Sequence, residues 1–182
     1  MRVFVTGGAG LIGRFAVDHL VRAGNTVVSL QRRPPAAGVL REPTEVVFGD
    51  VREGATYLEA IRGADSVLHL AAVPSPEGRS AQEVFSANTD ATMALLETAG
   101  EAGVKAVVLA SSISALGLAW APRVISPDYL PIDEAHPLRP SEGYGLSKEC
   151  DEAAARMASR LWGMSVLSLR FPYTQTHEQI VA

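Results

Sequence analysis

Short apolar runs alternate with longer amphipathic segments along this chain. Six runs rich in valine and leucine occur at 3–5, 26–30, 46–48, 67–70, 106–110 and 165–169, each bounded by turn-forming residues. Runs that are short and apolar at nearly every position are typical of strands buried on both faces. The alternation therefore predicts a doubly wound parallel α/β sheet with helices on both faces, in the order βαβαβαβαβαβ.

Helical periodicity fills the segments between several of these runs. From 12 to 20, apolar residues recur every four positions, and Gly24 follows where a left-handed cap is expected. The period returns at 57–61, 81–102 and 144–162. In the last of these segments Leu146, Cys150 and Leu161 fall on one face, which predicts an apolar face with Cys150 in the core.

Composition and charge are those of one ordinary globular domain. The 182 residues are 47% apolar and 20% charged, with a formal net charge of −4. This composition supports a core of its own but offers no basic patch for nucleic acid. The single cysteine fits a reducing compartment, and no apolar run approaches the ~20 residues that span a bilayer. We therefore expect a cytoplasmic protein with one domain over 1–182 and no nucleic-acid or membrane partner.

One long segment, 117–143, has no helical or strand pattern and contains five prolines. Loops of this length are usually functional. Trp120, Tyr129 and Leu130 in this loop either line a substrate entrance or anchor the loop itself. We expect His136 here and His177 near the C-terminus to face water.

No metal site is expected, because the histidines and the cysteine do not have the spacing of metal ligands. His69, inside the fourth apolar run, is instead expected to pack within the sheet.

A glycine-rich turn joins the first strand to the first helix. Gly7, Gly10 and Gly13 have the G-x-x-G-x-x-G spacing, with Leu11 and Ile12 between the last two. Such a turn lets the backbone approach a pyrophosphate, which then meets free N–H groups at the helix N-terminus. This predicts a dinucleotide-binding cradle; the alternative is a glycine turn without a ligand.

The ends of the second and third strands bear on which dinucleotide binds. An acidic residue after the second strand would bind the ribose hydroxyls of NAD, whereas arginine would accept the 2′-phosphate of NADP. Here Gln31, Arg32 and Arg33 occupy this position, which favours NADP over NAD unless both arginines belong to a solvated loop. Asp50 after the third strand could accept a hydrogen bond from the adenine amino group, or could cap the following turn.

Tyr144 and Lys148 lie four residues apart at the start of the last helix, with Ser141 as a candidate N-cap. A free tyrosine has a pKa near 10 and needs a neighbouring positive charge to act as a base at neutral pH. Ser111 and Ser112 end the fifth strand, where ligands bind in α/β proteins. A serine there can hold a substrate oxygen while Tyr144 moves a proton; the alternative is a pair of turn residues.

These motifs resemble, in order along the chain, the extended short-chain dehydrogenase/reductase family of NAD(P)-dependent sugar epimerases, dehydratases and dehydrogenases. The matching segments are 6–13, 49–51, 69–72, 88–92, 111–112 with Gly117, 144–148 and 169–172. The resemblance implies that Ser112, Tyr144 and Lys148 are catalytic and that Lys148 also binds the ribose. It assigns cofactor contacts to Ser111 and Tyr144 as well. Further cofactor contacts are expected from the glycine turn (Gly7, Gly10, Leu11, Ile12 and Gly13), from Gln31, Arg32, Arg33, Asp50 and Val51, and from Leu70, Ala71, Ala72 and Asn88. Asn88 could equally be a helix N-cap.

The resemblance also implies hydride transfer at a carbinol of a sugar, nucleotide sugar or sugar acid, in a homodimer built on the helices at 81–102 and 144–162. Ile113 and Ser114 follow Ser112 where a dehydratase would have an Asp-Glu pair, which leaves an epimerase or a dehydrogenase. The resemblance also implies a C-terminal substrate lobe after the sixth strand. We expect that the sequence is part of a longer chain with this lobe; the alternative is a minimal variant without it. The alternative function is a non-catalytic NAD(P)-sensing module that binds a partner protein.

Overall fold

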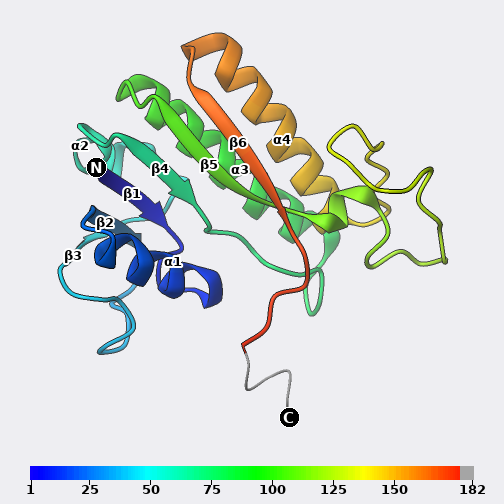
Figure 1. The fold of residues 1–182 in the computed structure, drawn as a ribbon, viewed down its shortest axis with the longest axis horizontal. Coiled ribbons are helices and arrows are strands. Elements are labelled where there is room, and N and C mark those ends of the chain that lie inside the picture. The colour runs from blue at the N-terminus through cyan, green and yellow to red at the C-terminus, as the bar shows by residue number, and fades with distance from the viewer. Residues whose placement is uncertain (177–182) are drawn as a thin grey trace.

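All six strands join one parallel sheet in the order β3-β2-β1-β4-β5-β6 (Figure 1). The computed structural model describes residues 1–176. The strands are β1 (Arg2–Thr6), β2 (Thr26–Gln31), β3 (Thr44–Phe48), β4 (Ser66–His69), β5 (Ala106–Ser112) and β6 (Ser165–Phe171). The α-helices are α1 (Leu11–Arg22), α2 (Leu58–Ile61), α3 (Ala81–Glu101) and α4 (Gly143–Trp162), and the 3₁₀ turns are η1 (Gly54–Thr56) and η2 (Ile113–Leu116). The predicted doubly wound α/β sheet is confirmed, since this strand order is that of a dinucleotide-binding sheet.

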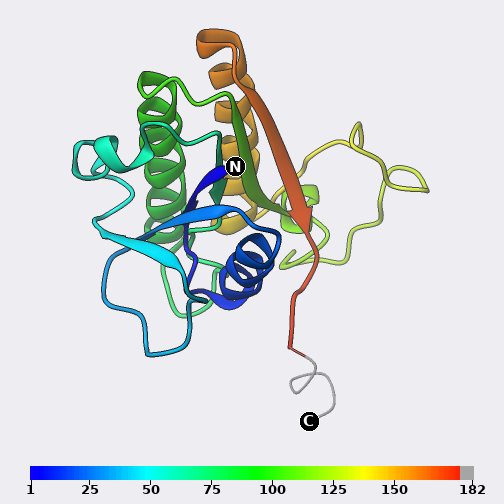
Figure 2. The same ribbon diagram turned by 60° about the vertical axis from the view of Figure 1, so that its left-hand side comes forward.

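The helices cover the two faces of the sheet unequally. On one face, α3 and α4 lie side by side (Figures 1 and 2), and a large core joins them to Phe4, Val67 and Leu109 of the sheet. On the other face, α1 packs through Val17 on a smaller core that includes Val5. The larger core therefore lies between the sheet and the two long helices.

The predicted strict alternation of strand and helix is wrong at one place. No helix connects β2 to β3, and residues 32–43, all within the described part of the chain, are irregular. Pro34, Pro35 and Pro43 lack the backbone N–H that a helix interior needs. The connection from β2 to β3 therefore runs without a helix or strand of its own. The predicted strand at 67–70 also ends one residue early, at His69.

The predicted apolar face of α4 is wrong as well. Leu146 and Leu161 are 43% and 63% exposed, and Cys150 is only half-buried. The buried face instead carries mostly polar side chains, namely Tyr144, Ser147, Lys148, Asp151 and Glu152, followed by Ala155 and Ala158. Polar residues can be buried where they are paired, so on this helix hydrogen bonding decides which face lies inside.

Local caps fix where the two long helices begin. Ser80 and Glu83 form a reciprocal capping box at the start of α3. Glu142 caps α4 by accepting hydrogen bonds from the backbone N–H groups of Tyr144 (2.6 Å) and Gly145 (2.5 Å). The predicted cap, Ser141, is therefore wrong by one residue. Within residues 1–176, no helix combines the length and hydropathy needed to cross a bilayer.

Candidate active site

The glycine turn after β1 is shaped by close backbone contacts. Gly7 has a φ of +71°, and a Cβ on it would lie 2.6 Å from the backbone nitrogen of Ala71. A side chain on Gly13 would run into the carbonyl oxygen of Gly7. The turn therefore packs closely against the backbone just after β4.

Gly10 is the exposed member of the three glycines and forms the N-cap of α1. In the described part of the chain, no side chain caps this helix and no acidic residue lies in its first turn. Leu11 is 38% exposed and Ile12 is half-buried. The positive end of the α1 dipole therefore faces an exposed, side-chain-free backbone, which suits a phosphate group.

Gln31 ends β2 as a buried residue, and its Nε2 donates a hydrogen bond to Ser29 Oγ (2.8 Å). Arg32 and Arg33 follow it and are both exposed. The Gly49 N–H donates to the Gln31 carbonyl (3.0 Å), which brings the ends of β2 and β3 together. Arg32 and Arg33 thus follow directly on the point where the ends of β2 and β3 meet.

Asp50 has the turn-capping role that the sequence left open. Its carboxylate accepts from the Arg52 backbone N–H (2.9 Å) and forms an ion pair with the Arg52 side chain (2.7 Å). Hydrogen bonding to Arg52 lowers the pKa of Asp50 to about 2, with Arg32 among the charges that contribute. Val51 follows it, and its carbonyl accepts from the Tyr57 hydroxyl (2.8 Å). The predicted contact of Asp50 with adenine stays a prediction.

Ser112, Tyr144 and Lys148 are brought together at the carboxyl end of β5. The Lys148 Nζ lies 5.9 Å from the centroid of the Tyr144 ring. The hydroxyl of Ser112 lies close enough to lower the pKa of the Tyr144 phenol, and it donates to Ser114 Oγ (3.1 Å) and accepts from the Ser114 N–H (3.1 Å). All three side chains are buried, with exposures of 9% or less. Gly145 allows this approach, because a Cβ there would lie 2.6 Å from the Ser114 carbonyl oxygen of η2.

The pKa of Tyr144 is raised above its ordinary value of 10, against our expectation of a lowered one. Burial is the largest cause, and the charges of Glu142 and Asp151 add to it, while the hydrogen bond with Ser112 acts in the opposite direction. The Lys148 ammonium is paired with the Asp151 carboxylate (3.1 Å), and this pairing reduces the positive charge that Tyr144 experiences. The protein surroundings alone therefore favour the neutral phenol.

Ser111, the neighbour of Ser112, faces the opposite side of β5. Its hydroxyl donates to Glu152 Oε1 (2.6 Å), and Arg170 of β6 binds both oxygens of the same carboxylate (2.9 Å each). We call these three residues the Glu152 clamp. The Ser111 side chain thus joins β5, α4 and β6, and the predicted cofactor contact of Ser111 stays a prediction.

Asn88 lies in the interior of α3, so its alternative as an N-cap is wrong. Its side chain accepts from the Val73 N–H (2.7 Å) and donates to the Val73 carbonyl (3.2 Å) and to Ser147 Oγ (3.0 Å). It therefore fixes the segment after β4 to α4. Leu70, Ala71 and Ala72 belong to this segment, and the Ala71 N–H donates to Thr6 Oγ1 (3.3 Å).

His69 packs between two threonines, as expected. Its Nδ1 is hydrogen-bonded to Thr6 Oγ1 (2.6 Å) and its Nε2 to Thr92 Oγ1 (3.4 Å). Burial, and to a lesser degree the charge of Lys148, lowers the pKa of His69 to about 3, so the ring is neutral. Among residues 1–176 no cluster of His, Cys, Asp or Glu has the arrangement of a metal site.

Two acidic residues close to the site were not predicted from the sequence. Asp151 and Glu152 lie three and four residues after Lys148, on the same face of α4, and both are buried. Their signal was their spacing, since residues at i+3 and i+4 from a buried lysine share its face. The apolar positions of α4 instead predicted that the other face of the helix is buried.

The loop at 117–143 projects to one side of the fold (Figure 2) and is folded on itself. His136 is buried, contrary to expectation, because its ring contacts Tyr129 (4.9 Å between centroids) and its Nε2 accepts from the Asp128 N–H (3.0 Å). Tyr129 is thus a loop anchor, whereas Leu130 is 76% exposed. His177 lies outside the described residues.

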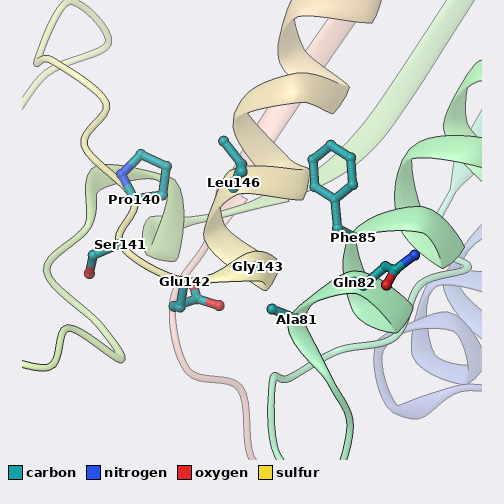
Figure 3. Close-up of a pocket in the computed structure, with 8 residues that line it drawn as sticks. All are labelled: Ala81, Gln82, Phe85, Pro140, Ser141, Glu142, Gly143 and Leu146. Carbon is teal, nitrogen blue, oxygen red and sulfur yellow. The ribbon is translucent and has the colours of Figure 1, made fainter.

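A shallow groove lies where α3 and α4 begin (Figure 3). Phe85 and Leu146 line it on the two helices, and Glu142 lies at its edge. The carboxylate of Glu142 is already used in capping α4. The groove contains no residue predicted for catalysis or cofactor binding, so it is separate from the candidate active site.

Known proteins resemble this chain over most of its length. Residues 3–174 match the family described as the NAD dependent epimerase/dehydratase family. A UDP-glucose 4-epimerase from Streptomyces lividans is 38% identical over 81% of this chain and 44% of its own length. An L-arabinose 1-dehydrogenase (NAD(P)(+)) from Haloferax volcanii is 30% identical over 98% of this chain and 69% of its own length.

Solved structures lead to the same family. A short-chain dehydrogenase/reductase superfamily protein from Agrobacterium tumefaciens, with NAD bound, superposes with a TM-score of 0.81 at 35% identity, covering 96% of this chain and 50% of that one. This chain thus spans between 44% and 69% of the length of these three relatives. The family match covers the glycine turn, the β5 serines and the Tyr144–Lys148 pair. The chain therefore belongs to the NAD-dependent epimerase/dehydratase family of extended short-chain dehydrogenases/reductases.

Proposed function

We propose that this chain carries the cofactor-binding and catalytic half of an NAD(P)-dependent enzyme that transfers hydride at a carbinol of a sugar, nucleotide sugar or sugar acid. The observation that carries the proposal is the convergence of Ser112, Tyr144 and Lys148 at the carboxyl end of β5. A strand order typical of dinucleotide-binding sheets supports it.

The residues around the glycine turn fit a dinucleotide. Gly10, Leu11 and Ile12 would present backbone N–H groups to the pyrophosphate at the start of α1. Lys148 would bind the hydroxyls of the nicotinamide ribose, and the backbone at 70–72 would line the cofactor beside Gly7. When bound, the dinucleotide would supply a nicotinamide ring that accepts or returns a hydride.

The protein side chains manage the proton and the substrate oxygen. Ser112 would donate a hydrogen bond to the oxygen at the reacting carbon and hold it beside Tyr144. In the oxidative direction the carbon loses a hydride, and the deprotonated Tyr144 takes the hydroxyl proton, leaving a carbonyl. In the reverse direction the neutral phenol returns that proton. The positive charge of Lys148 favours the phenolate needed in the first case.

The choice of cofactor depends on Arg32 and Arg33. Two exposed guanidinium groups and no carboxylate follow β2, and this favours NADP through its 2′-phosphate. One relative is named for NAD(P)(+), whereas a solved neighbour contains NAD. We therefore expect both dinucleotides to bind, with NADP(H) the tighter of the two.

The relatives support a sugar-like substrate, because they include a UDP-glucose 4-epimerase and an L-arabinose 1-dehydrogenase. We further propose a cytoplasmic homodimer in which the outer faces of α3 and α4 meet those of a second copy. The exposed Leu146 and Leu161 of α4 support this arrangement, since apolar side chains are enriched at homodimer interfaces.

The test combines cofactor binding with turnover. Fluorescence titration with NADH and NADPH measures affinity, and reduction of NAD and NADP is then followed with a panel of sugars, sugar acids and nucleotide sugars. Tyr144→Phe is expected to keep cofactor affinity within about threefold but to lower kcat at least about a hundredfold, because general acid-base catalysis contributes that much. Cys150→Ser, on the half-buried side of the same helix, is the matched control.

Two results would contradict the proposal. Full activity in Tyr144→Phe would remove the phenol from the proton transfer. Cofactor binding without turnover of any substrate, together with redox-dependent capture of a protein partner, would support the alternative of a sensing module.

A further inference from the structure

Lys148 has a buried acidic partner that the proposed reaction does not use. Its Nζ donates to Asp151 Oδ2 (3.1 Å), and the two side chains are only 5% and 4% exposed. Burying a charged pair is costly unless the geometry and further hydrogen bonds compensate it. A pair of this kind, directly beside Tyr144, therefore requires an explanation other than stability.

The second oxygen of this carboxylate is unusual. Asp151 Oδ1 is buried and, among the described residues, is the side-chain atom left without a hydrogen-bond partner. On the same helix, by contrast, both oxygens of Glu152 are bound by Arg170. Asp151 Oδ2 is bound by the ammonium of Lys148, and the hydroxyl of Thr92 lies close enough to influence the carboxylate.

We propose that Asp151 is a positioning residue that holds the Lys148 ammonium at its place behind Tyr144 and limits how much of its positive charge acts on the phenol. The inference rests on the proposed function, in which Tyr144 exchanges a proton and Lys148 supports it. Asp151 thereby keeps Tyr144 able to return a proton as well as to take one, which a reaction that runs in both directions requires.

The charges around Asp151 determine the direction of the effect. Lys148 and Glu152 face it from α4, and Arg170 of β6 is already paired with Glu152. Burial raises the pKa of Asp151 above its ordinary value, while Lys148 and the hydroxyl of Thr92 of α3 act in the opposite direction. His69 of β4, beyond Thr92, is neutral. The negative charge of Asp151 raises the pKa of Tyr144. Removing that charge, and with it the partner of Lys148, should therefore lower the pKa of Tyr144.

The experiment follows the Tyr144 phenol by ¹³Cζ-tyrosine NMR during a pH titration, with the signal assigned through Tyr144→Phe. In Asp151→Asn, which keeps the shape and removes the charge, we expect the pKa of Tyr144 to fall by about one unit. The matched control is Glu149→Gln, which removes one negative charge from the same turn of α4 outside the buried face and should leave that pKa unchanged. This readout needs neither cofactor nor substrate.

A second variant covers the case in which Asp151→Asn does not fold. Asp151→Ser also removes the charge of the carboxylate and leaves a smaller polar side chain, so the pKa of Tyr144 should fall in the same direction. An unchanged pKa of Tyr144 in whichever of these two variants folds, or an equal shift in Glu149→Gln, overturns the inference. Failure of the proposed function would instead appear as absent NAD(P)H binding or unimpaired turnover by Tyr144→Phe.

Discussion

At the scale of single residues, the three glycines of the turn after β1 serve different purposes. Gly7 and Gly13 are required by the protein itself, since a Cβ on either would overlap the backbone of the turn or of the segment after β4. Gly10 is exposed, and a Cβ there would lie 3.1 Å from the Gly7 carbonyl oxygen, a contact that a small shift relieves. The absence of a side chain at Gly10 therefore serves the approach of a ligand more than the fold.

This difference predicts opposite outcomes for two alanine substitutions. Gly13→Ala should lower the free energy of unfolding by about 2 kcal/mol or more, because it forces overpacking against Gly7. Gly10→Ala should cost less than about 1 kcal/mol but weaken NADH binding about tenfold. Urea denaturation and NADH titration measure the two quantities. If both variants lost NADH affinity in proportion to the stability that they lost, the assignment of Gly10 to the ligand would be contradicted.

The sequence predicted which candidate residues come together better than it predicted their electrostatics. The convergence of Ser112, Tyr144 and Lys148 could be predicted because strand ends and helix spacing are local properties. The raised pKa of Tyr144 could not, because its largest cause is burial, which depends on how α4 packs in the fold. A pattern along the chain does not show how deeply a polar side chain is buried.

At the scale of elements, the Glu152 clamp joins three pieces of secondary structure. Ser111 of β5 and Arg170 of β6 both bind Glu152 of α4, so one carboxylate sets the position of the helix on the two strands. The apolar periodicity of α4 pointed to the wrong face because this side of the helix is buried through paired polar groups. Sequence patterns that count only hydrophobic positions miss such a face.

The clamp predicts a pH-dependent contribution to stability. Burial raises the pKa of Glu152, but hydrogen bonds from Arg170 and Ser111 outweigh it, so the pKa lies below its ordinary value of 4.5. A lowered pKa stabilises the fold above pH 4.5, and this contribution is lost as the pH falls through the pKa of the folded state. Glu152→Gln should therefore cost about 2 kcal/mol at pH 7 and clearly less at pH 4.

Urea denaturation of both proteins at the two pH values measures this difference. Ser111→Ala is the matched variant, because it removes one neutral donor and leaves the ion pair with Arg170. Its cost should be about 1 kcal/mol. A cost of Glu152→Gln that is the same at pH 7 and pH 4 would show that the charge of the carboxylate does not contribute.

At the scale of the whole molecule, the sheet is covered on one face and partly open on the other. Residues of β5 and β6 alternate between the faces, so Leu109 packs under α3 and α4 while Leu167 and Leu169 face the side where α1 lies. Because α1 packs on β1 and β2, it does not reach these leucines, which are 56% and 38% exposed. Parallel sheets are normally covered on both faces. Within residues 1–176, the strands without such cover could not be predicted from the sequence, because the apolar runs of β5 and β6 are alike.

The unequal cover predicts unequal costs for two identical substitutions on neighbouring strands. Leu109→Ala should lower the free energy of unfolding by about 3 kcal/mol, because Leu109 is 2% exposed and its loss leaves a cavity beneath the two long helices. Leu167→Ala should cost less than about 1 kcal/mol, since more than half of that side chain already contacts solvent. Urea denaturation monitored by circular dichroism gives both values. Similar losses of unfolding free energy in the two variants would mean that the exposed face of β6 is covered in solution.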